Sequence, residues 1–384
     1  MCALALSMLG CALFAEAQSD PGQQAFALER EGKLGEAEAA WSAIAKQHPT
    51  NPEPLAHLGL IESRQEHYSQ AIAFYRRAVA LNPSMPGLRL NLGLAYFKAG
   101  DYAHAIQELE PMLKAQPGDE RLTVLVGMSH YGLGQFAAAS PYLKEASKQD
   151  PQNLNLLLTL AHSCLLSNQY PCVLDAYHQI VALNAESAEA DMLVGEALDL
   201  MKDPEGAIRE FKAAVAVNPK EPNVHFGLGY LLWTRAQYSE AMPEFQAELA
   251  NDPHHLQAML YLADSYIQLN RMDDAEPLLE KLVQLNPQNS MAHRDLGAVY
   301  VDKDRKQDAL KEFEAAARLT PNDVNVHWRL GRLYRSMGES AKAKAEFDKT
   351  GGLNRAADEN LLKVMSRNPA GTAPKTESNS PSNK

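Results

Sequence analysis

Apolar residues recur along this chain with a helical period, in two short stretches within every 34 residues. Each stretch predicts a helix of about 14 residues. A turn is predicted between the two, around Gly32, Gly100, Gly134 and Gly338, where a left-handed residue ends the first helix. Each pair then ends at a proline, which cannot continue a helix. The prolines are spaced by 34, or by twice 34 where Ala185 replaces one: Pro49, Pro83, Pro117, Pro151, Pro219, Pro253, Pro287 and Pro321.

Small residues follow the same spacing inside the predicted helices. Most first helices carry a glycine: Gly59, Gly93, Gly127, Gly195, Gly229, Gly297 and Gly331. Most second helices carry an alanine, as at Ala71 and Ala105, with an aromatic residue or leucine four positions later. Two helices this short cannot bury a face alone, so the pairs must stack on one another. We expect small residues where helix axes approach closely, with side chains such as Tyr96 and Leu109 filling the space beside them.

This pattern resembles the tetratricopeptide repeat, whose signature is L-G-x-x-Y, A-x-x-x-F and a proline in a unit of 34. One clear example joins Leu92, Gly93, Tyr96, Ala105 and Leu109 to a proline at position 117. The usual tryptophan at the fourth position of the unit is absent. The resemblance implies an all-α fold, a right-handed α-solenoid of about ten helix-turn-helix units. Their expected boundaries are 18–51, 52–85, 86–119, 120–153, 154–187, 188–221, 222–255, 256–289, 290–323 and 324–357.

Both ends of the chain depart from the repeat. Residues 355–367 predict a capping helix, because Ala357, Leu361, Val364 and Met365 share one face. Residues 368–384 have too few apolar side chains to bury, so we expect a disordered tail.

The N-terminal residues 1–17 are typical of a secretory signal peptide. An apolar stretch from Cys2 to Phe14 is followed by Ala15, Glu16 and Ala17, which fits a small-x-small cleavage pattern. The stretch is too short to span a bilayer, and no Lys or Arg precedes Arg30. We expect a periplasmic or secreted protein; the alternatives are a lipid anchor on Cys11 and a cytoplasmic location. Beyond these residues only Cys164 and Cys172 remain, either as a disulfide or as two small buried thiols.

Candidate chemistry is sparse. Neither a P-loop, H-E-x-x-H, G-x-S-x-G nor C-x-x-C occurs, so we predict no enzyme, no catalytic residue, no cofactor and no metal ion. His254 and His255 fit a solvated loop. His225, His293 and His327 share one packing position and are expected as stacked, partly buried imidazoles, with a metal site or proton relay as the alternative. A net charge of −12 would repel a phosphate backbone, which disfavours nucleic acid as a partner.

Each first helix carries a second apolar arc. At about 100° per residue, Leu92, Gly93 and Tyr96 form the packing arc, and a second arc lies roughly a third of a turn away. In proteins similar to this one, the second arc lines a concave groove that binds peptides or helices. Near the C-terminus, arginines there would pair with acidic groups of a partner. The expected groove residues are Leu90, Leu94, Phe97, Val124, Met128, Tyr131, Leu158, His162, Phe226, Tyr230, Trp233, Leu260, Asp264, Arg294, Trp328, Arg332 and Arg335.

Three classes of function remain open. The favoured one is a noncatalytic scaffold that binds a peptide or partner subunit in the groove, in cell-envelope assembly or secretion. The second is a self-associating structural solenoid, since the second arc can also pad one first helix against the next. The third is an accessory module of a separately encoded enzyme. All three involve a protein partner and none involves a transmembrane span.

Overall fold

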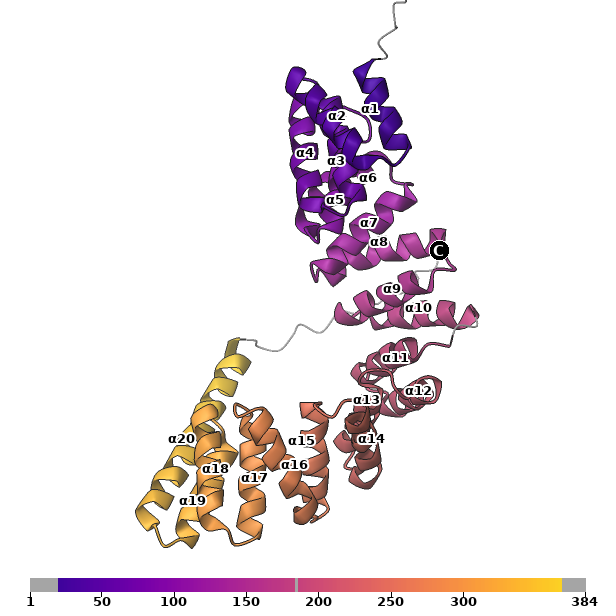
Figure 1. Cartoon of the computed structure of the whole chain (residues 1–384). Coiled ribbons are helices and arrows are strands. Elements are labelled where there is room, and N and C mark those ends of the chain that lie inside the picture. The colour runs from indigo at the N-terminus through magenta and orange to yellow at the C-terminus, as the bar shows by residue number, and fades with distance from the viewer. Residues whose placement is uncertain (1–19, 184–185, 368–384) are drawn as a thin grey trace, which may run out of the picture. The chain divides into compact units, whose positions relative to one another are not determined.

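Across residues 20–183 and 186–367, the part of the chain that this computed structural model describes, there are twenty α-helices and no β-strand. Side chains of residues 357, 358 and 360–367 fall outside that description. The predicted all-α solenoid is confirmed (Figure 1). The chain divides into two compact units, residues 1–186 and 187–384. Their boundary lies next to position 185, where alanine replaces the expected proline.

The first unit contains ten helices within its described residues, and each helix packs on the next along the chain (Figure 1). Odd-numbered helices are the first helices of the predicted pairs, and even-numbered helices are the second helices. The helices are α1 (Pro21–Arg30), α2 (Leu34–Gln47), α3 (Pro52–Arg64), α4 (Tyr68–Leu81), α5 (Leu88–Lys98), α6 (Tyr102–Ala115), α7 (Glu120–Gly132), α8 (Phe136–Gln149), α9 (Leu154–Leu166) and α10 (Tyr170–Ala182).

The second unit repeats this arrangement with ten further helices in its described part. They are α11 (Ala188–Leu200), α12 (Pro204–Val217), α13 (Val224–Thr234), α14 (Tyr238–Asn251), α15 (Leu256–Gln268), α16 (Met272–Leu285), α17 (Ser290–Asp302), α18 (Lys306–Leu319), α19 (Val324–Ser336) and α20 (Ser340–Arg367).

Two local devices set where the helices begin and end. Most first helices start at a side chain that accepts a backbone N–H of the first turn, as Asn51, Asn153 and Asp323 do. The turn that follows each first helix contains one residue with positive φ. All ten of these residues keep the 34-residue spacing: Gly32, Glu66, Gly100, Gly134, Asn168, Lys202, Ala236, Asn270, Asp304 and Gly338. The four glycines agree with the prediction, and the other six turns adopt the same conformation without one.

Close packing inside each pair explains the glycines of the first helices. A Cβ atom at Gly93 would lie 2.6 Å from Cγ of Leu109, and a Cβ at Gly297 would lie 2.7 Å from the ring of Phe313. Leu109 and Phe313 are fully buried. The glycine therefore forms the hole into which the large residue of the second helix packs, as predicted for Gly93.

Side-chain hydrogen bonds join the two helices of several pairs, between residues nineteen positions apart. Nδ1 of His225 lies 2.7 Å from Glu244, and His293 and His327 contact Glu312 and Glu346 in the same way. An arginine occupies the equivalent position at Arg89 and donates to Glu108. The three histidines thus bind glutamates within their own pairs, whereas the sequence predicted imidazoles stacked at one packing position.

The C-terminal helix differs from the sequence-based expectation. Residues 355–367, predicted as a separate cap, form the end of α20, which runs without a break from Ser340 to Arg367. Gly351 and Gly352 do not have positive φ, and two glycines lower helix propensity without ending a helix. The predicted signal peptide and disordered tail lie outside the described residues.

The two cysteines that the sequence left open form a disulfide. It joins Cys164 of α9 to Cys172 of α10, with Cα atoms 5.8 Å apart. The bond therefore crosslinks the two helices of one pair in the first unit.

Ala236 offers a test of the turn geometry. Its φ is 57°, a conformation that disfavours every residue with a Cβ. Ala236→Gly is expected to raise the free energy of unfolding by up to about 1 kcal/mol, measured by urea denaturation. Ala213→Gly removes the same methyl group from the exposed interior of α12 and should lower the free energy by about 1 kcal/mol. Equal destabilisation by both variants would contradict the turn argument.

Gly93 offers a test of the packing. Gly93→Ala should lower the free energy of unfolding by about 1–3 kcal/mol, because the buried Leu109 side chain cannot move away. Gly35→Ala in α2 is the matched control, since a Cβ atom added there would meet nothing within 4 Å. This control should be neutral or slightly stabilising. A Gly93→Ala variant as stable as Gly35→Ala would disprove the close approach.

Candidate functional site

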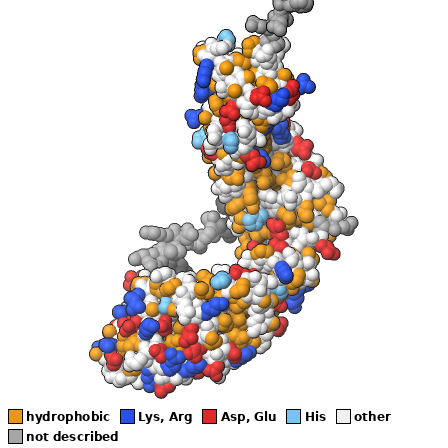
Figure 2. All heavy atoms as spheres, viewed as in Figure 1, with side chains coloured by type: hydrophobic (Ala, Val, Ile, Leu, Met, Phe, Trp, Pro, Cys, Tyr) orange, Lys and Arg blue, Asp and Glu red, His pale blue; other side chains and the backbone are white. Residues whose placement is uncertain are grey.

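The residues expected in the groove differ in exposure between the two units. In the first unit all eight are partly buried: Leu90, Leu94, Phe97, Val124, Met128, Tyr131, Leu158 and His162. Tyr131 and His162 hydrogen bond to each other across neighbouring pairs. Hydrophobic side chains gather over α7 to α9 on the face shown in Figure 2. Tyr131 and His162 therefore link α7 to α9, and all eight residues leave only part of their surface for a partner.

The second unit exposes more of its expected residues. Tyr230, Trp328, Arg332 and Arg335 are exposed, while Phe226, Trp233, Asp264 and Arg294 are partly buried. Leu260 is buried, because it packs within the hydrophobic core, and it offers little surface to a partner. Contacts between α11, α13, α15 and α17 make the first helices a continuous surface. We call this surface, extended by α19, the first-helix face.

An aromatic cluster stands at the middle of the first-helix face. Tyr230 and Trp233 of α13 lie 5.2 Å and 4.8 Å, between ring centroids, from Tyr261 of α15. Phe226 of α13 lies 6.0 Å from the same tyrosine. Tyr230 remains 37% exposed. Tyr261 was missed by the sequence analysis, although its place one residue after Leu260 puts it beside the preceding first helix.

Asp264 orients the cluster. Nε1 of Trp233 donates to Oδ2 of Asp264 over 2.7 Å, and Gln268 donates to the other carboxylate oxygen. Burial raises the pKa of Tyr261, with contributions from the neighbouring Tyr230 and Asp264. Asp264 was predicted to contact a partner, and the structure gives its carboxylate the additional task of holding the indole in place.

A pocket of about 440 Å³ opens between α11 and α13, next to the cluster. Phe226 and Tyr230 form one side, and Met192 and Glu196 of α11 form another. Glu196 is exposed, and partial desolvation by the pocket wall raises the pKa of its carboxyl. The sequence predicted a first helix here within the unit 188–221, but none of the expected groove residues lies on α11.

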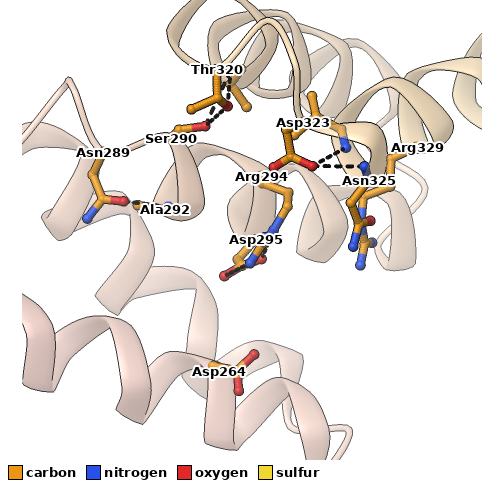
Figure 3. Close-up of polar contacts among 12 residues, drawn as sticks. Asp264, Asn289, Ser290, Ala292, Arg294, Asp295, Thr320, Asp323, Asn325 and Arg329 are labelled. Carbon is orange, nitrogen blue, oxygen red and sulfur yellow. Dashed lines mark hydrogen bonds and ion pairs between the residues drawn. The ribbon is translucent and has the colours of Figure 1, made fainter. Parts of the chain in front are cut away.

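A polar cluster lies farther along the same face. Arg294 donates through Nε to Asp295 over 2.8 Å, and Nε of Arg329 donates to Asn325 over 3.0 Å. Figure 3 shows these two arginines on neighbouring helices, with Asp264 on the helix beyond. The residues line a pocket of about 420 Å³.

Burial perturbs the charges of this polar cluster. It raises the pKa of Asp295 despite the hydrogen bond from Arg294, and it lowers the pKa of Arg329. On α19 the guanidinium of Arg332 stacks 4.8 Å from the ring of Trp328, which is 43% exposed. Charged side chains crowd the surface of α16 to α20 in the view of Figure 2. Arg294 is thus paired with Asp295, whereas Arg332 and Arg335 of α19 are exposed.

Across the described residues, no three His, Cys, Asp or Glu side chains converge as ligands for a metal ion. Within the same residues, no helix is long and apolar enough to cross a bilayer.

Comparison with protein families gives matches along most of the chain. Two family models described as tetratricopeptide repeat match it. One covers residues 63–126, 130–197 and 232–298, and the other covers residues 23–86, 201–255 and 294–350. Among curated proteins, none matches this chain.

Several solved structures are similar to parts of this chain at low identity. MamA from Desulfovibrio magneticus RS-1 is 22% identical, with a TM-score of 0.43, over 44% of this chain and 97% of its own. YrrB, described as a TPR protein with an unusual peptide-binding site, is 19% identical, with a TM-score of 0.42, over 50% of this chain and 97% of its own. The Cut9-Hcn1 structure is 16% identical, with a TM-score of 0.46, over 79% of this chain and 59% of its own. At these values no partner or site is transferred to this chain.

The contact between Trp233 and Asp264 gives a testable prediction. Asp264→Leu removes the only acceptor that the described structure provides for the Trp233 indole N–H. In the variant, the Trp233 indole N–H signal in ¹⁵N-tryptophan NMR spectra should shift, and the exchange of that hydrogen with solvent should accelerate. Asp199→Leu, on the same face but without a bond to Trp233, is the control. An unchanged Trp233 signal in Asp264→Leu would contradict the orienting role.

Proposed function

The chain belongs to the tetratricopeptide repeat family, and we propose from this premise that it is a noncatalytic scaffold that binds a peptide segment of a partner protein. The first-helix face of the second unit is the proposed binding surface. The observation that carries the proposal is the aromatic cluster, because Tyr230 and Trp233 are held in fixed positions yet Tyr230 keeps over a third of its surface exposed.

Aromatic side chains of this kind are suited to binding. Trp, Tyr and Arg dominate the energetics of protein interfaces, because they bury a large area and lose little conformational entropy. The Asp264 hydrogen bond and the contacts with Tyr261 orient Trp233 before a partner arrives. An apolar or aromatic side chain of the partner would cover the exposed rings and remove them from water.

The arginines of the same face add a second contact. Arg332 and Arg335 are exposed on α19, beside the exposed ring of Trp328. An acidic group of the bound segment would pair with these cations and stack against the ring. The segment would thus have apolar residues over α13 and α15 and an acidic group over α19.

The proposal is tested by crosslinking in cells from a photoreactive phenylalanine placed at Tyr230, with the same residue at Tyr238 of α14 as the control. We expect an adduct at position 230 that maps to one contiguous segment of another protein, and none at position 238. A synthetic copy of that segment should bind the purified chain. Its affinity for the Trp233→Ala variant should be at least about tenfold lower than for the wild type. An adduct to a second copy of this chain would favour self-association instead, and no adduct at position 230 would contradict the proposal.

We also propose that the protein acts outside the cytoplasm, in cell-envelope assembly or secretion. The supporting features are the signal-like residues 1–17 and the disulfide between Cys164 and Cys172, because such bonds persist in oxidising compartments. Cell fractionation with thiol labelling tests this location. A cytoplasmic protein in which Cys164 and Cys172 are both free thiols would contradict it.

A further inference from the structure

The pocket between α11 and α13 has no cation of its own. Neither helix contains a lysine or arginine, and α11 carries four acidic residues. Glu196 has no hydrogen bond or ion pair to another described residue, and it lines the pocket wall together with Asp199. Glu196 is exposed on the pocket wall, and partial desolvation by the surrounding atoms, without a counter-ion to offset it, raises the pKa of its carboxyl.

The other walls of the pocket suit the stem of a long cationic side chain. Phe226 and Tyr230 present aromatic rings, whose faces attract cations. Met192 and Leu231 add apolar surface along which methylene groups can lie. The volume of about 440 Å³ lies within the range of pockets that hold ligands.

Competing occupants fit this pocket less well. An apolar side chain would remove more water from Glu196 and supply no compensating charge. An acidic side chain would be repelled by Glu196 and Asp199. A basic side chain can pair with the carboxylate through its cationic group and contact the aromatic rings through its stem.

We propose that the pocket between α11 and α13 binds a lysine or arginine side chain of the partner segment, with its cationic group at Glu196 and its stem against Phe226 and Tyr230. This inference rests on the proposed function, since it assigns one side chain of the segment bound there. It also gives the segment a direction. The basic residue lies toward α11, and the acidic group lies toward the arginines of α19.

The test selects random peptides displayed on phage against the full chain. Selected peptides are then synthesised, and their affinities are measured for the wild type and for the Trp233→Ala, Glu196→Gln and Glu189→Gln variants. Glu189 is exposed on α11 but does not line the pocket, so Glu189→Gln is the matched control. We expect the peptides to share one lysine or arginine.

Replacing that shared basic residue by norleucine should weaken binding to the wild type by about tenfold. The same replacement should have little effect on binding to Glu196→Gln, while Glu189→Gln should behave as the wild type. This inference would be overturned by peptides that depend on Trp233 but lack a shared basic residue. It would also be overturned if the basic residue contributed as much to binding of Glu196→Gln as of the wild type. Either result would leave the proposed function standing. Selected peptides that bind Trp233→Ala as tightly as the wild type would contradict both.

Discussion

Most helix pairs in the described chain depend on close contact between a glycine of the first helix and a large residue of the second. Gly93 with Leu109 and Gly297 with Phe313 show the requirement in its strictest form, because a single methyl group would overlap the buried side chain. Such a pair buries one apolar face between its two helices and leaves a second apolar face uncovered. Within each unit the next pair covers that remaining face, so stability spreads along the chain through neighbouring contacts.

Because the turns are regular, equivalent residues of successive first helices lie at regular spacing on one surface. A positive φ at each of the ten turns ends the first helix at the same point, and side-chain caps start most first helices at the same point. Equivalent positions of successive first helices therefore recur side by side. On the second unit, this register places Tyr230 and Trp233 next to Tyr261, and Arg294 near Arg329.

The first-helix face of the second unit changes character along its length. Carboxylates without basic neighbours line the α11 end, oriented aromatic rings occupy the middle, and partly desolvated arginines follow on α17 and α19. A scaffold without catalytic groups can achieve selectivity in this way. The repeats share one backbone arrangement, whereas charged and aromatic side chains differ from one first helix to the next.

The sequence by itself determined the repeat, because a spacing of 34 in glycine, alanine and proline reports directly on helix length and on close approach between helices. It also indicated Phe226, Tyr230 and Trp233, since one helix places them on one side. Tertiary structure decided which of these residues are exposed. Leu260 is buried, Tyr261 joins the cluster, and Asp264 bonds to Trp233, because these outcomes depend on contacts between residues about thirty positions apart. The left-handed turns at Glu66 and Ala236 were likewise visible only in the structure, because the local preference of that conformation is for glycine.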